Sequence, residues 1–176
     1  QANIYCIILC RILKVKIIVR SNSSPSGWYH NNLKKIIYKY FISKADQVIV
    51  NSYEFKKQME SKFNIKVNCI LNPLNIKYIN KKSKSGKSDP FFKKKRYLKL
   101  INLGRFTEQK DQITILKACK ILKNDLNFKL LILGKGYEKI RMQKFIIDNN
   151  LTHNIKLKNF IENPYKLIAQ SDIFIL

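Results

Sequence analysis

Residues 100–111 decide the fold, and they run Leu-Ile-Asn-Leu-Gly-Arg-Phe-Thr-Glu-Gln-Lys-Asp. The opening apolar run is typical of a buried strand that ends at Gly104. Arg105 follows at once, and Lys110 comes five residues later, where the pattern predicts the start of a helix. Two cations and the free N–H groups of a helix start would then surround one small volume. Such a place suits a phosphate or a diphosphate.

Apolar runs and amphipathic stretches alternate on both sides of this segment. Strands are expected at residues 15–19, 47–50, 67–71, 98–103, 128–133, 155–157 and 173–176. Helices are expected at residues 31–43, 112–124, 137–149 and 164–170, and one more is expected to begin after a cap at Asn51. Apolar strands separated by helices predict parallel βαβ units, and therefore an α/β fold. Ligands of parallel sheets bind beyond the carboxyl ends of the strands, where Gly104-Arg105 and Gly134-Lys135-Gly136 both lie.

Residues 74–97 break this alternation. The run from Asn80 to Pro90 has almost nothing to bury, and the basic run 93–96 follows it. We expect a solvated basic linker between two globular halves. A nucleic-acid-binding arm is the sharper alternative, in which Tyr97 and the Phe91-Phe92 pair would stack on bases.

The chain has 176 residues and a net charge of +24, from 35 Lys and Arg against 11 Asp and Glu. Such a charge attracts nucleic acid, anionic lipid headgroups or nucleotide diphosphates. A lysine-rich background on solvated faces is the simpler explanation. The hydrophobic content of 45% argues against disorder.

The cysteines and the chain ends suggest an intracellular piece of a longer protein. Each of the four cysteines (Cys6, Cys10, Cys69 and Cys119) sits in an apolar run, which predicts free core residues in a reducing cytosol. The apolar stretch 4–19 is interrupted by cations and is too short for a membrane span. Both ends look cut inside structured regions, so we expect a fragment.

The remaining candidate motifs leave alternatives open. Gly134-x-Gly136 lacks the third glycine of a dinucleotide fingerprint, so an ordinary strand-to-helix turn is favoured over a cofactor loop. The loop before His30 carries substrate contacts or is an ordinary surface loop. The sequence has no Asp-x-Asp pair and no His/Cys/Asp cluster, so we expect neither a metal nor another cofactor.

Five segments, taken in order, resemble a known family. They are Ala45-Asp46-Gln47-Val48-Ile49-Val50-Asn51-Ser52, Asn72-Pro73-Leu74-Asn75, Gly104-Arg105-Phe106 with Gln109-Lys110-Asp111, Ile132-Leu133-Gly134-Lys135-Gly136, and Ser171-Asp172-Ile173-Phe174-Ile175-Leu176. Their order is similar to that of the retaining GT-B glycosyltransferases of group 1, or family 4. Asn75 stands where that family usually has aspartate.

The resemblance implies two Rossmann-like βαβ domains of the GT-B type, both truncated here. Residues 1–73 would be the C-terminal part of the N-terminal, acceptor-side domain, and residues 74–97 a basic interdomain linker. Residues 98–176 would be the N-terminal part of the donor-binding domain. Gly104, Arg105 and Lys110 map onto the donor-diphosphate site. Ile161 maps weakly onto the nucleobase side, because Asn159 replaces the usual glycine. The catalytic residues are unknown, since the two-glutamate signature is expected after Leu176.

The function implied is glycosyl transfer of the hexosyltransferase type. A sugar would move from a nucleotide-diphosphate donor to a cell-surface or lipid-linked glycan, with retention and without a metal or another cofactor. The enzyme would work in the cytoplasm, peripherally on an anionic membrane surface, and without a nucleic-acid partner. The alternatives are a basic nucleic-acid-binding protein and a nucleotide-sugar-binding module without catalysis. This stretch alone need not be active.

Overall fold

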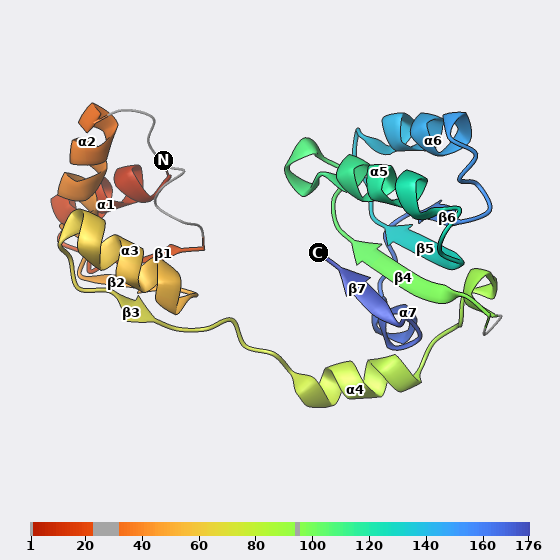
Figure 1. Ribbon diagram of the computed structural model, residues 1–176. Helices are drawn as coiled ribbons and strands as arrows, with labels where there is room; N and C mark the ends of the chain where they lie inside the picture. The colour runs from red at the N-terminus through yellow and green to blue at the C-terminus, as the bar shows by residue number, and fades with distance from the viewer. Residues whose placement is uncertain (1, 23–31, 94–95) are drawn as a thin grey trace. The chain divides into compact units, whose positions relative to one another are not determined.

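The structure, a computed structural model, describes residues 2–22, 32–93 and 96–176 (Figure 1). The chain divides into two compact units, Gln1–Leu74 and Asn75–Leu176. Each unit has its own parallel sheet and its own hydrophobic core. The α/β class and the parallel pairing predicted from the sequence are confirmed.

The first unit is a parallel sheet in the order β1 (Ile18–Ser21), β2 (Gln47–Val50) and β3 (Asn68–Cys69). Its helices are α1 (Ala2–Ile12), α2 (Asn32–Ile42) and α3 (Tyr53–Phe63). The core joins Val48 and Val50 of β2 to Met59 and Phe63 of α3. The sequence did not predict α1, because its apolar side chains surround the helix instead of forming one stripe.

The N-terminus of α3 is capped by Ser52, one residue after the predicted cap. The Ser52 hydroxyl accepts hydrogen bonds from the backbone N–H groups of Glu54 (3.2 Å) and Phe55 (3.4 Å). This bonding satisfies two of the donors that every helix start leaves free. The prediction of a cap at Asn51 is therefore wrong by one position.

The second unit is a parallel sheet in the order β6-β5-β4-β7. Its strands are β4 (Leu98–Leu103), β5 (Phe128–Leu133), β6 (Ile155–Lys158) and β7 (Ile173–Ile175). Its main helices are α5 (Gln112–Leu122), α6 (Lys139–Asp148) and the short α7 (Tyr165–Ala169). Leu103 of β4 pairs with Leu133 of β5, so both strands end at the same level.

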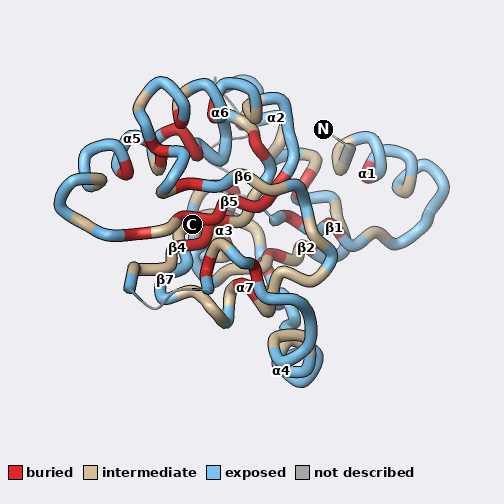
Figure 2. The backbone as a smooth tube through the Cα atoms, turned by 90° about the vertical axis from the view of Figure 1, so that its right-hand side faces the viewer, coloured by how far each residue is buried: buried red, intermediate tan, exposed pale blue. Residues whose placement is uncertain are grey.

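Both faces of this sheet are covered. Leu100, Leu130 and Ile132 point into a cluster with side chains of α5 and α6. The alternate residues, Ile101 and Leu131 among them, pack against Leu167 of α7 and Phe92. Figure 2 shows the buried backbone following β4 and β5. Because both faces are buried, these strands read as continuous apolar runs in the sequence.

The segment 74–97 differs from the solvated linker that the sequence predicted. It contains α4 (Ile76–Lys84) and a 3-10 helix, η2 (Pro90–Phe92). The Tyr78 ring of α4 meets the Tyr165 ring edge-on, with centroids 6.3 Å apart. Asp89 and Phe92 are buried, so the expectation that this segment buries almost nothing is wrong.

Asp89 holds the turn at η2 to the sheet. Its carboxylate forms an ion pair with Lys158, and Lys156 Nζ lies 4.0 Å from Oδ1. The backbone N–H of Phe91 donates to Oδ1 at 2.9 Å. Burial by itself would raise the pKa of Asp89. The hydrogen bonds from Lys158 and Phe91 and the charges of both lysines outweigh burial and hold this pKa below its ordinary value of 3.8.

The cysteines behave differently from one another. All four are free, as predicted, but only Cys119 on α5 is buried, and Cys6 is exposed. Burial raises the pKa of the Cys119 thiol to about 11. The prediction that each cysteine is a core residue therefore holds for Cys119 only.

Among the described residues, no helix combines the length and the apolarity needed to cross a membrane.

Candidate functional site

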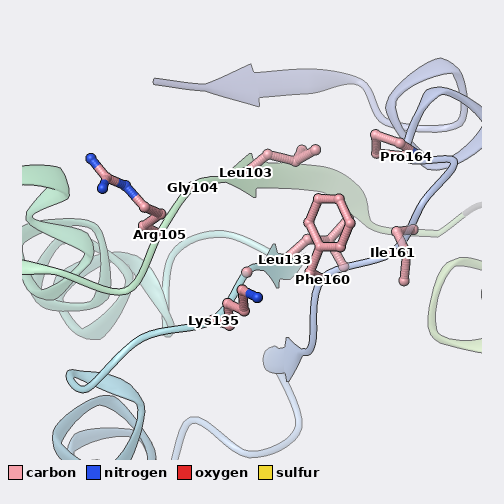
Figure 3. A pocket seen from close by; sticks show the side chains of 9 residues that line it. Leu103, Gly104, Arg105, Leu133, Lys135, Phe160, Ile161 and Pro164 are labelled. Atoms are coloured by element: carbon pink, nitrogen blue, oxygen red, sulfur yellow. The ribbon is translucent and has the colours of Figure 1, made fainter.

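A cavity of about 390 Å³ opens at the carboxyl ends of β4 and β5 (Figure 3). It is lined by Leu103, Gly104, Arg105, Leu133, Gly134, Lys135, Phe160, Ile161 and Pro164. A cavity of similar size, about 400 Å³, lies in the first unit at the amino ends of β2 and β3. Ligands of parallel sheets bind at the carboxyl ends of the strands, so the cavity of the second unit is the candidate site.

Two glycines let the loops after β4 and β5 pack backbone against backbone. A Cβ atom at position 134 would lie 1.9 Å from the carbonyl oxygen of Gly104. A Cβ atom at position 136 would lie 2.2 Å from the carbonyl oxygen of Phe106, and Gly136 has a φ of +155°. The Gly-x-Gly pair is therefore explained by loop packing, and this packing forms one wall of the cavity.

Hydrogen bonds fix the backbone around Arg105. The N–H of Gly104 donates to Leu133 O (3.0 Å), and the N–H of Phe106 donates to Lys135 O (2.9 Å). The buried Gln112 side chain donates from Nε2 to Arg105 O at 3.0 Å. The Phe106 ring is fully buried below the loop. The Arg105 side chain itself is exposed and, in Figure 3, extends away from Phe160 and Ile161.

Lys110 lies beside Gly104, although it does not line the cavity. It ends the 3-10 helix η3 (Glu108–Lys110), and Asp111 follows in the left-handed conformation with a φ of 43°. This turn folds the lysine back, so that a Cβ atom built on Gly104 would lie 3.6 Å from Lys110 Cγ. The structure thus brings Gly104, Arg105 and Lys110 together at the end of β4.

Lys135, Phe160 and Pro164 are among the lining residues that were not assigned to the site from the sequence. Lys135 adds a third cation, from the loop after β5. Phe160, which is 68% exposed, and Pro164 lie with Ile161 on the segment between β6 and α7 (Figure 3). The family resemblance pointed to the segment around Asn159 and Ile161, but only the sheet order shows that Phe160 and Pro164 lie beside β4 and β5.

The cavity combines an apolar wall with a cationic border. Its wall comes from leucine, isoleucine, phenylalanine and proline side chains, and none of the lining residues is acidic. Such a surface suits a ligand that has a flat apolar part and an anionic part. Within residues 2–22, 32–93 and 96–176, no cluster of three His, Cys, Asp or Glu side chains could hold a metal ion. His30 and its loop lie outside the described residues.

The comparisons with known proteins place the chain in a glycosyltransferase family with the GT-B fold. Residues 84–176 match the family described as glycosyl transferases group 1, and the chain belongs to this family. This assignment agrees with the resemblance drawn from the five sequence segments.

Two curated relatives and one solved structure illustrate the similarity. The chain is 34% identical to an uncharacterized glycosyltransferase of Methanocaldococcus jannaschii, over 96% of this chain and 45% of the relative. It is 28% identical to the N-acetylgalactosamine-N,N'-diacetylbacillosaminyl-diphospho-undecaprenol 4-alpha-N-acetylgalactosaminyltransferase of Campylobacter jejuni, over 92% of this chain and 44% of the relative. The crystal structure of Anabaena HepE in complex with UDP superposes with a TM-score of 0.73 at 15% identity, over 98% of this chain and 50% of that one. The chain thus spans about half the length of these relatives.

Proposed function

We propose that this chain carries the donor-diphosphate site of a retaining family 4 glycosyltransferase. The enzyme would move a sugar from a nucleotide-diphosphate donor to a cell-surface or lipid-linked glycan. Residues 98–176 would belong to the donor-binding Rossmann-like domain and residues 1–73 to the acceptor-side domain, both parts of a longer protein. The two compact units, Gln1–Leu74 and Asn75–Leu176, support this division, and the coverage of about half of each relative supports a longer protein.

The observation that carries the proposal is the cationic end of β4 beside an apolar cavity. Arg105 and Lys135 line this cavity, and Lys110 lies beside Gly104. The guanidinium of Arg105 would bind two diphosphate oxygens at once, and the two lysines would add point charges. The apolar segment with Phe160 and Ile161 would cover the nucleobase.

The chemistry follows from the charge that develops on the leaving group. Breaking the bond between the sugar and the diphosphate leaves negative charge on the diphosphate oxygens. Fixed cations next to these oxygens stabilise that charge as it forms. In this proposal the cations stabilise the leaving diphosphate in place of a metal ion, and no metal is required. The catalytic residues themselves are expected outside this chain.

The names of the relatives favour particular substrates. HepE was crystallised with UDP, and the Campylobacter enzyme is named for an undecaprenol diphosphate acceptor. We therefore take UDP as the first nucleotide to test and a polyprenol-linked glycan as the first acceptor. The enzyme would then act at the cytoplasmic face of a membrane, where a net charge of +24 favours anionic lipid. The family match does not favour the nucleic-acid-binding alternative.

Calorimetric titration of the chain with nucleotides tests the proposal. We expect UDP to bind and uridine to bind much more weakly, because uridine lacks the diphosphate that the cations contact. GDP distinguishes a uridine-specific site from a general diphosphate site. If neither UDP nor GDP binds to the folded chain, the donor-site proposal is wrong.

A further inference from the structure

The segment between β6 and α7 carries three lining residues of the cavity without forming a helix or strand there. Phe160, Ile161 and Pro164 lie on it, and Ile161 packs only partly into the core. Little in the backbone of this loop fixes its position, because its N–H and C=O groups belong to no strand ladder. Lys139 Nζ donates to Asn159 Oδ1 at 2.8 Å at the start of the loop, so the rest of the loop needs a contact of its own.

Asn163 supplies this contact. Its Nδ2 donates to Lys82 O at 3.1 Å and to Ser85 O at 3.3 Å. Both carbonyls lie at the C-terminal end of α4, where a helix leaves its last carbonyls without partners inside the helix. Because both acceptors are carbonyls, the amide must present its NH₂ group to them. One side chain therefore caps α4 and ties it to the loop of the cavity.

The surroundings of Asn163 are fitted closely to the amide. Gly86 follows α4 with a φ of +107°, and a Cβ atom there would lie 3.2 Å from Asn163 Nδ2. The Oδ1 atom of Asn163 is buried without a hydrogen-bond partner among the described residues. The Oε1 atom of Gln170 is buried in the same way, so the two hydrogen bonds from Asn163 Nδ2, and not its oxygen, distinguish Asn163.

We propose that Asn163 is a positioning residue that sets the nucleobase side of the cavity by tying the loop 160–164 to α4. This inference rests on the proposed function for the identity of the ligand. It goes beyond the donor site itself, because Asn163 does not line the cavity. It also gives a role to α4, the first helix of the second unit.

The chain offers a matched control at the same interface. Gln170, at the end of α7, donates from Nε2 to Ser88 Oγ at 2.6 Å. This bond also joins α7 to the segment after α4, but Gln170 is not on the loop of the cavity. Gln170→Ala therefore removes a similar tether without releasing Phe160 and Ile161.

The test compares the unaltered chain with Asn163→Ala, Asn163→Asp and Gln170→Ala. UDP affinity is measured by calorimetry, and the backbone mobility of residues 159–162 is measured by ¹⁵N NMR relaxation without nucleotide. We expect Asn163→Ala to increase this mobility and to weaken UDP binding roughly tenfold, the scale of one lost hydrogen bond. Asn163→Asp should behave alike because a carboxylate cannot donate. Gln170→Ala should change neither measurement.

The two measurements separate the possible failures. If the unaltered chain binds no nucleotide, the proposed function fails, and the backbone mobility of residues 159–162 alone decides whether Asn163 positions the loop. Unchanged mobility in Asn163→Ala overturns the inference. Unchanged UDP affinity in Asn163→Ala also overturns it when the unaltered chain binds UDP. An equal effect of Gln170→Ala on both measurements would show that general docking of α7, and not Asn163, sets the loop.

Discussion

Two glycines at neighbouring strand ends have different roles, although both follow a leucine. Gly134 packs against backbone, because the atom nearest to a built Cβ is the carbonyl oxygen of Gly104. Gly104 packs against side chains and not backbone, since the nearest atoms are Gln112 Nε2 at 3.2 Å and Lys110 Cγ at 3.6 Å. Backbone cannot move aside as the end of a lysine side chain can. A substitution of Gly134 should therefore mainly lower stability, and a substitution of Gly104 should mainly weaken binding.

Gly134→Ala should therefore unfold the second unit more easily. We expect its free energy of unfolding to fall by about 3 kcal/mol, the upper range for overpacking a close contact. Urea denaturation followed by circular dichroism measures this change. Gly104→Ala is the control. It should lower the free energy of unfolding by less than about 1 kcal/mol, and it should weaken UDP binding more than Gly134→Ala does. Equal losses of stability in both variants would contradict this account.

Arg105 is the cation that we expect to contribute most to turnover. In the full-length enzyme, Arg105→Ala should lower the rate of glycosyl transfer by about 10²–10³, the cost of removing one donor to a developing oxyanion. Arg105→Lys should recover only part of the rate because the bidentate geometry is lost. Lys120→Ala removes an exposed cation of α5 outside the site and is the matched control. A folded Arg105→Ala enzyme with an unchanged rate would exclude Arg105 from the donor site.

At the scale of elements, η2 joins the segment after α4 to the sheet through the buried carboxylate of Asp89, in addition to the packing of Phe92. The Asp89 side chain is 1% exposed, and its partners Lys156 and Lys158 lie on β6. The ion pairs with the two lysines exist only while Asp89 is ionised. The turn therefore depends on the ionised form of Asp89, because breaking a buried ion pair is costly.

This dependence predicts a loss of stability in acid. The pKa of Asp89 is lower in the folded than in the unfolded chain. Its contribution is therefore present above about pH 3.8 and is lost as the pH falls through the lower, folded value. Thermal unfolding of the second unit from pH 6 to about pH 2 should show this loss. Asp89→Asn should be less stable at neutral pH and should flatten the acid dependence, and an equally steep curve would contradict the role of Asp89.

The sequence predicted those elements whose signals are local. The bounds of β2, β4 and β5 agree with the expected ranges, because strands buried on both faces read as apolar runs with clear ends. The clustering of Gly104, Arg105 and Lys110 also followed from one short segment. The buried turn at Asp89 could not be predicted, since its lysine partners lie on a distant strand. The part played by Phe160 and Pro164 depends likewise on the order of the strands.

At the scale of the whole molecule, the balance of charge bears on the metal requirement. The chain carries 35 Lys and Arg against 11 Asp and Glu, and three of these cations surround the end of β4. If they bind the diphosphate directly, a divalent ion adds nothing essential. We expect UDP affinity to be the same with EDTA and with Mg²⁺. A strong loss of affinity in EDTA would show that a metal ion bridges protein and diphosphate.

The buried thiol of Cys119 is a built-in probe for opening of the second unit. A thiol reagent reaches an exposed sulfur such as that of Cys6 directly, whereas the Cys119 sulfur must wait for α5 to separate from the sheet. Labelling of Cys119, followed by peptide mass spectrometry at pH 8, should therefore be slow and should report the opening rate of the second unit. If UDP binds beside β4 and β5, it should slow this labelling and leave that of Cys6 unchanged. Rapid labelling of Cys119 in the native chain would show that this half opens freely.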